Sequence, residues 1–125
     1  MKKIIFTKKA GQPIGPYNQA VLANGTLYIS GQIALNADSG ELIQNSLEDE
    51  TTQVMKNLNF ILEEAGYSFA DVVKTSIFLS DMSFFGKVND IYGSYFEKDF
   101  PARETVEVSR LPKDVNVEIS MIAVK

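Results

Sequence analysis

The chain contains no cysteine, no histidine and no tryptophan among its 125 residues. The lack of cysteine excludes a disulfide framework, a thiol nucleophile and a thiolate metal site. The lack of histidine removes the side chain that most often acts as a base near neutral pH and most often binds transition metals. Any catalysis must therefore depend on carboxylates, lysine, arginine, tyrosine, backbone groups and water.

An excess of positive charge is also missing, because 12 lysines and arginines face 16 aspartates and glutamates, for a net charge of −4. Sequence-independent binding of nucleic acid depends on dense basic residues, so this balance argues against a nucleic-acid partner. Long apolar runs are absent, and Ile4–Phe6 after two lysines is too short for a signal-peptide core. We expect a cytoplasmic protein that does not bind membranes and that folds as one domain over residues 1–125.

The C-terminal stretch 100–123 contains two alternating runs on either side of Leu111–Asp114, a pattern typical of a β-hairpin. If Arg110 faces Val115 across the turn, one face of the hairpin is apolar and is expected to lie in the core. That face carries Val106, Val108, Val115, Val117, Ile119 and Met121. The opposite face carries Arg103, Thr105, Glu107, Ser109, Asn116, Glu118 and Ser120.

Two interpretations of this polar face remain open, namely the solvated side of a sheet and a binding surface. Arg103 favours the second, because it follows Pro101-Ala102 and therefore stands where a strand begins. A planar guanidinium at such a position suits a carboxylate or a phosphate.

Turn signals organise the first third of the chain. Asn24-Gly25 separates two strand-like runs, 17–23 and 26–30, and predicts a hairpin. Gly31 directly follows the second strand, where a bulge or bend is favoured over close approach of a ligand.

Two helices and one buried strand are predicted in the middle of the chain. The first helix begins at Ser46 and ends at Gly66, and its acidic residues 48–50 suit a helix N-terminus better than a metal site. The run 72–79 predicts a buried strand, and a second helix follows from about residue 84 to 96 with Ser83 as its cap. Asn89 lies beside the apolar stripe of that helix, where it is either an ordinary exposed residue or the edge of a pocket.

The predicted order of elements is β, ββ, α, β, α, ββ. It indicates an α+β fold with two helices on one face of a six-stranded mixed sheet. The other face of the sheet is then either solvated or covered by further copies of the chain.

Several separate motifs resemble the RidA/YjgF family of reactive-intermediate deaminases, and the match spans nearly the whole chain. The motifs are Ile14–Tyr17, Ile29–Gln32, Val88-Asn89, Pro101–Arg103, Leu111-Pro112 and Val117–Ile119. The resemblance implies a chorismate-mutase-like fold and a homotrimer with a central β-barrel and a ligand cleft at each subunit interface.

The resemblance also implies hydrolysis of the enamine and imine acids that pyridoxal-phosphate-dependent dehydratases release, such as 2-aminoacrylate and 2-aminocrotonate, to 2-oxo acids and ammonia. No cofactor and no metal are implied. Arg103 would bind the substrate carboxylate, while Glu118 and Tyr17 would hold or activate the attacking water. The cleft would be lined by Ser30, Gly31, Asn89 and Thr105.

In the hairpin register, Arg103 and Glu118 are offset by about four residues, or roughly 13 Å at ~3.3 Å per residue. One small substrate can hardly span that distance. We therefore predict a composite site at which residues from two protomers meet. Arg103, Thr105 and Asn89 come from one protomer, and Tyr17, Ser30 and Glu118 come from its neighbour.

Two positions depart from the common family pattern, because Thr105 stands where a cysteine is frequent and Ser120 where a second glutamate is frequent. These departures leave the substrate range open. The main alternative to the enzyme is a non-catalytic trimer that binds 2-oxo acids in a regulatory or chaperone-like role. An RNA-cleaving translation inhibitor, a function attributed to some family members, is disfavoured by the acidic charge and the lack of histidine.

Overall fold

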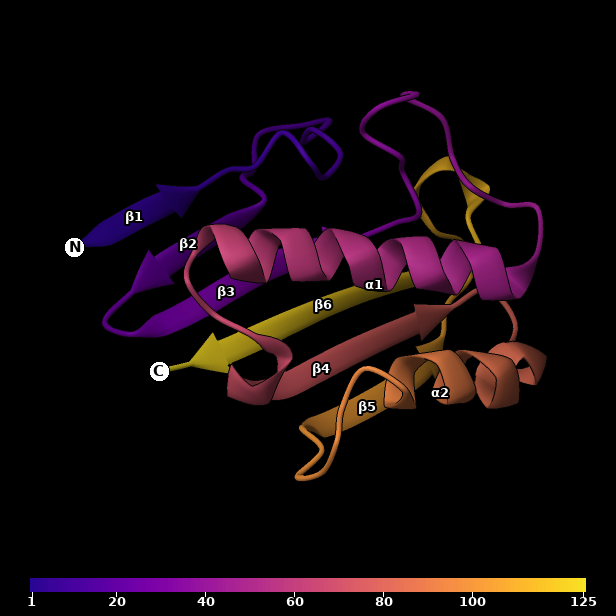
Figure 1. Cartoon of the computed structure of the whole chain (residues 1–125). Helices are drawn as coiled ribbons and strands as arrows, with labels where there is room; N and C mark the ends of the chain where they lie inside the picture. The colour runs from indigo at the N-terminus through magenta and orange to yellow at the C-terminus, as the bar shows by residue number, and fades with distance from the viewer.

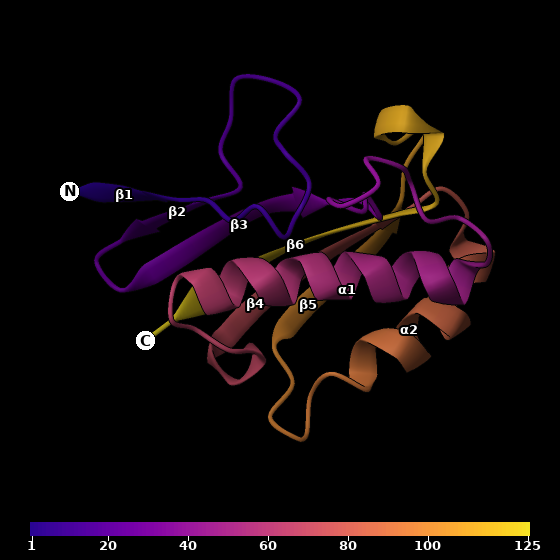
Figure 2. The same cartoon turned by 45° about the horizontal axis from the view of Figure 1, so that its top comes forward.

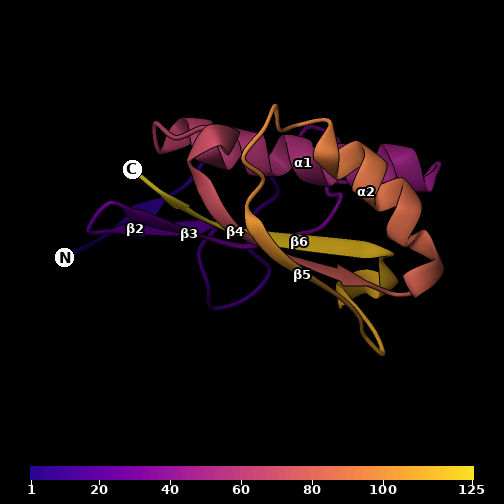
Figure 3. The ribbon, with the colours of Figure 1, turned by 90° about the horizontal axis from the view of Figure 1, so that it is seen from below.

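The computed structural model describes residues 1–125, and both helices pack on the same face of one six-stranded sheet (Figures 1 and 3). The strands are β1 (Lys2–Ile5), β2 (Ala20–Ala23), β3 (Thr26–Gln32), β4 (Val72–Leu79), β5 (Ala102–Glu107) and β6 (Val117–Val124). The helices are α1 (Leu47–Glu64) and α2 (Phe85–Gly93), and short 3-10 turns lie at Phe69–Asp71, Met82–Phe84 and Pro112–Asp114. The predicted α+β class with a mixed sheet is confirmed. No helix is long and apolar enough to cross a membrane.

The strands follow the order β1-β2-β3-β6-β4-β5, and only the β4–β5 pair is parallel. Helix α2 makes the crossover that a parallel pair requires. The predicted C-terminal hairpin is therefore wrong, because β4 lies between β5 and β6. Alternating sequences specify which face of a strand is buried, but they do not specify the neighbouring strand. Both β5 and β6 pair with the buried strand β4, one on each side of it.

This pairing also corrects the predicted faces of β5. Thr75 pairs with Arg103 and Ile77 pairs with Thr105. Because Ile77 is buried beneath the helices, Arg103 and Thr105 lie on the helix-covered face and not on the open one. Val106, predicted to lie in the core, is 39% exposed on the open face. The prediction holds for β6, whose odd-numbered residues from Val117 to Ala123 are buried.

The hairpin predicted at Asn24-Gly25 joins β2 to β3. Both residues have positive φ angles, 52° and 77°, as a two-residue type I′ turn requires. The register of β3 against β6 shifts between Ile29 and Gln32, so Gly31 lies in a β-bulge, as predicted.

Helix α1 has the predicted ends. The Ser46 hydroxyl accepts a hydrogen bond from the backbone N–H of Asp49 at 3.0 Å, and Gly66 follows the helix with φ +79°. Its apolar side packs on the sheet, with Val54, Leu58 and Ile61 completely buried.

Helix α2 is shorter than predicted, and its N-terminal cap lies elsewhere. The cap predicted at Ser83 is wrong, since Asp81 accepts the backbone N–H of Ser83 at 2.8 Å and starts a 3-10 turn. The aromatic residues expected in the last helical turn lie in a loop, where Tyr95 and Phe96 pack against Phe69 at ring-centroid distances of 5.4 and 5.5 Å. The apolar pattern after α2 therefore reflects the packing of aromatic side chains and not a continuation of the helix.

The loop between β1 and β2 rises well clear of the sheet (Figure 2). In Figure 3 this loop and the segment before β6 project on the side of the sheet opposite the helices. The same open face presents apolar side chains, because Tyr28 and Val124 are 50% and 46% exposed.

Candidate functional site

Arg103 stands at the start of β5, directly after Pro101 and Ala102. The carbon of its guanidinium lies 5.1 Å from the ring centroid of Tyr92 and 5.6 Å from that of Phe85, so two aromatic rings of α2 hold it by cation–π contacts. The ion pairs of the chain are Lys74–Glu104, Lys87–Glu48 and Arg110–Asp114, and none involves Arg103. Arg103 is thus a positioned cation without a counter-ion.

Tyr92 is the fixed part of this platform. Its side chain is buried, and its hydroxyl hydrogen-bonds to the Thr75 hydroxyl at 3.0 Å. Burial raises the pKa of the Tyr92 phenol, so the ring stays neutral. Asn89 and Arg103 line the same shallow depression with Tyr92, Gly93, Phe100 and Pro101.

Thr105 follows Arg103 by two residues on the same face of β5. Its hydroxyl oxygen is buried and has no hydrogen-bond partner within the chain. An unsatisfied buried hydroxyl costs about 1–3 kcal/mol, which a bound ligand or water would offset. Arg103, Asn89 and Thr105 therefore form one group on the helix-covered side of the sheet.

Glu118 is the second residue of β6 and lies on the open face, since it pairs with Phe78 one position away from the buried Ile77–Ile119 pair. Burial raises the pKa of the half-buried Glu118 carboxyl above its ordinary value. The carboxylate lies against Gly31, where a Cβ atom would stand 2.8 Å from the Cδ atom of Glu118. The glycine in the bulge is thus what leaves room for Glu118.

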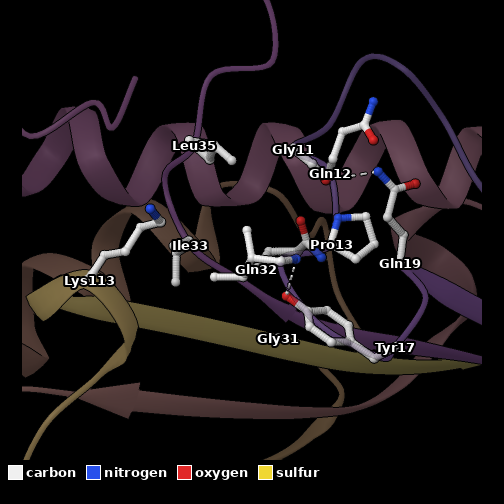
Figure 4. A pocket seen from close by; sticks show the side chains of 11 residues that line it. Gly11, Gln12, Pro13, Tyr17, Gln19, Gly31, Gln32, Ile33, Leu35 and Lys113 are labelled. Atoms are coloured by element: carbon white, nitrogen blue, oxygen red, sulfur yellow. Dashed lines mark hydrogen bonds between the residues drawn. The ribbon is translucent and has the colours of Figure 1, made fainter. Parts of the chain in front are cut away.

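Ser30 and Tyr17 lie near this second group. The Ser30 hydroxyl donates to the carbonyl oxygen of Asn18 at 2.6 Å, so it is held by the loop that carries Tyr17. Tyr17 is 47% exposed, and together with Gly31 it lines a depression that Figure 4 shows from close by.

Two structural supports of this group were not predicted. The amide of the buried Gln19 accepts the N–H of Thr7 at 2.7 Å and donates to the carbonyls of Thr7 and Gly11, both at 3.0 Å, which fixes the Tyr17 loop. The completely buried Glu50 accepts the backbone and side-chain N–H groups of Asn116 at 2.9 and 2.8 Å, two residues before Glu118. The sequence did not distinguish Glu50 from the other acidic residues in the first turn of α1, and nothing in the sequence indicates that Asn116 is its partner.

Within one chain, the structure keeps the two groups apart. Arg103 and Glu118 lie on opposite faces of the sheet and on strands separated by β4. The predicted separation of Arg103 and Glu118 by a roughly 13 Å offset along a hairpin is therefore wrong. The two side chains are separated because they lie on opposite faces of the sheet. That one site combines groups from two protomers stays a prediction.

Comparison with known proteins covers the whole chain. The family model described as "Endoribonuclease L-PSP" matches residues 7–125. A RutC family protein of Pyrococcus horikoshii is 50% identical, with 100% of this chain and 99% of that protein covered. The mouse 2-iminobutanoate/2-iminopropanoate deaminase is 47% identical, with 100% and 93% covered.

Solved structures agree with these sequence relatives. YyfA of Yersinia pestis, described as a member of the conserved Rid protein family, has a TM-score of 0.97 and 49% identity, with both chains covered in full. Escherichia coli TdcF with bound serine has a TM-score of 0.94 and 37% identity, with 98% of each chain covered.

Proposed function

The chain belongs to the endoribonuclease L-PSP family, which includes the RidA/YjgF proteins, and on this premise we propose that it is a 2-imino acid deaminase. The substrates are the small enamine and imine acids that pyridoxal-phosphate-dependent dehydratases release, 2-iminopropanoate and 2-iminobutanoate. The products are 2-oxo acids and ammonia. A cytoplasmic location is part of the same proposal.

The observation that carries this proposal is the unpaired Arg103. A guanidinium held by the Tyr92 and Phe85 rings, with no carboxylate to neutralise it, suits the carboxylate that every 2-imino acid carries. Asn89, which lines the same depression, offers hydrogen bonds to the same small ligand. TdcF, a structural relative, has been solved with serine, itself a small carboxylic acid.

The proposed chemistry needs only a positioned water and a base. Glu118 accepts a proton from the water as its oxygen bonds to the imine carbon, and the phenol of Tyr17 orients that water. The electron pair of the C=N bond passes to the nitrogen of the protonated imine, which gives a carbinolamine. Glu118 then returns its proton to that nitrogen, the C–N bond breaks to release ammonia, and the hydroxyl proton is lost as the C=O bond of the 2-oxo acid forms. A carboxyl of raised pKa suits this exchange better than an ordinary one, because its ionised form is a stronger base towards the attacking water.

Arg103 and Glu118 can share a substrate only if two chains meet. We therefore include in the proposal a homotrimer in which the open faces of three sheets form a central barrel, and Arg103 of one protomer faces Glu118 of the next. Exposed Tyr28, Val106 and Val124 support burial of this face, because apolar side chains gathered on one face mark an association surface.

The direct test couples the protein to threonine dehydratase and follows the imine absorbance together with 2-oxobutyrate release. Wild type should accelerate the decay beyond the spontaneous rate, and Arg103→Ala should not. Arg110→Ala is the matched control, since Arg110 is exposed and paired with Asp114 at 2.6 Å. Decay at the spontaneous rate with wild type, while 2-oxobutyrate still binds, would favour the non-catalytic binding protein instead.

The family description also names an endoribonuclease. RNA cleavage has weaker support in this chain, whose 16 acidic residues outnumber its 12 basic ones and which has no histidine. RNA degradation that persists unchanged in Arg103→Ala and Glu118→Gln would point to a contaminating nuclease.

A further inference from the structure

Lys113 is the only charged residue that lines the depression beside Tyr17 and Gly31. Figure 4 shows Lys113 on one side of this depression and Tyr17 on the other, with Gln32 and Ile33 between them. A second depression continues from the first, sharing Lys113 and the loop 11–14, and adds one further charged residue, Lys8. No aspartate or glutamate lines either depression, although the chain has 16 acidic residues.

The ammonium group of Lys113 has no ion-pair partner within the chain. Its neighbour Asp114 is engaged elsewhere, because both of its carboxylate oxygens accept hydrogen bonds from Arg110, at 2.6 and 3.2 Å. The Lys113 ammonium on its wall is therefore unpaired, and the one carboxyl group beside the depression is that of Glu118 against Gly31, whose pKa burial raises. Such a site favours an anion.

The backbone holds Lys113 in place at an energetic cost. Lys113 and Asp114 have φ angles of 56° and 55°, in the left-handed region that glycine adopts more readily than lysine. A glycine would make the same turn with less strain. The lysine side chain thus adds a charge at the depression that the turn itself does not require.

The size of the depression limits what can bind there. Its free volume is about 40 Å³, room for about three water molecules and therefore for a carboxylate group.

We propose that the depression between Tyr17 and Lys113 is a subsite for an anionic substrate side chain, so that the protein also accepts 2-imino dicarboxylic acids. This inference rests on the proposed deaminase site, in which Tyr17 and Gly31 flank the reacting carbon. The α-carboxylate binds Arg103 of the adjacent protomer, and a carboxylate one methylene beyond the reacting carbon binds the Lys113 ammonium. The aspartate-derived imine fits this description, and its asparagine-derived isostere lacks only the charge.

Equilibrium binding tests the subsite without any turnover. Oxaloacetate and 2-oxobutyrate have the same four-carbon chain and differ in the terminal carboxylate. Lys113→Met should weaken oxaloacetate binding about tenfold, the loss typical of one charged hydrogen bond, and leave 2-oxobutyrate unchanged. Lys9→Met is the matched control, because Lys9 lies in the loop between β1 and β2 that borders both depressions but lines neither of them.

Two further results separate the possible roles. Lys113→Gly should lose the preference for oxaloacetate while its melting temperature stays level or rises, which a purely structural lysine would not do. Turnover of the aspartate-derived imine should fall in Lys113→Met relative to that of the asparagine-derived imine. Equal loss for both ligands, or no loss for either, would overturn the subsite and leave the deaminase standing. Selective oxaloacetate binding without any imine turnover would keep the subsite and overturn the deaminase.

Discussion

The carboxylate of Glu118 packs on the backbone of Gly31, so that a Cβ atom at position 31 would stand 2.8 Å from the Glu118 Cδ atom. Gly31→Ala should therefore displace the carboxylate and lower imine hydrolysis by on the order of a hundredfold, since small misplacements of a reacting group have such effects. The coupled dehydratase assay measures this loss. Gly86→Ala is the control, because no atom outside its helix lies within 4 Å of a Cβ atom there. Full activity in Gly31→Ala would show that Glu118 needs no fixed position.

The raised pKa of Glu118 predicts where the rate of imine hydrolysis falls on the acidic side of its pH profile. The carboxyl must be ionised to accept a proton, so the rate should fall as pH drops through a midpoint above the ordinary value of 4.5. Ser120 shares the open face two residues away, and Ser120→Glu should shift the midpoint upward by adding a like charge. A limb that does not move with Ser120→Glu would assign the titration to another group.

The same raised pKa also predicts how the stability of the fold changes with pH. Burial disfavours the ionised carboxyl, so the contribution of Glu118 to folding is fully present below its unfolded pKa and is lost as pH rises through its folded pKa. Glu118→Gln should therefore flatten this part of the stability profile, which denaturation at several pH values would reveal.

Subunit mixing tests whether the site is shared between chains. Arg103→Ala and Glu118→Gln should each be inactive alone. After equal mixing and random exchange, about three quarters of trimers are mixed and each holds one intact site of three, which restores about one quarter of wild-type activity. Mixtures that stay inactive despite demonstrated exchange would place both groups in the same subunit's site.

The buried Glu50 predicts a stability difference between two substitutions. Glu50→Ala leaves the two Asn116 N–H groups without acceptors and should lower the free energy of unfolding by about 2–4 kcal/mol. Glu50→Gln keeps one acceptor and similar volume, so its loss should stay below about 1.5 kcal/mol. Urea denaturation measures both, and similar losses would show that packing rather than hydrogen bonding dominates at this position.

Local sequence signals predicted the helices, strands and turns of this fold more reliably than they predicted which strands pair with each other. The ends of α1 were readable because Ser46 and Gly66 act on adjacent backbone groups, and Asn24-Gly25 determined its own turn. The pairing partner of β5 was not readable, because the parallel pair with β4 depends on where α2 places the chain.

For the candidate site too, local sequence signals identified individual residues but not their long-range contacts. Arg103 and Glu118 could be chosen from residue type, motif and position, but the hairpin model assigned Arg103 to the wrong face. Glu50 and Gln19 were missed because each is defined by contacts with distant segments, Asn116 and Thr7. Lys113 gave no signal in sequence, since only the folded chain shows the left-handed turn and the lack of neighbouring acids.

The position of β6 at the centre of the sheet has a consequence for how the protein folds. During N-to-C synthesis, β3 and the inner edge of β4 lack their common neighbour until β6, the last strand in chain order, is available to fill the gap between them. The nascent chain must therefore keep two unpaired strand edges, on β3 and β4, from aggregating until β6 emerges. We expect folding to be slow for a chain of this length and dependent on chaperones at high expression, because its final step joins segments far apart in sequence.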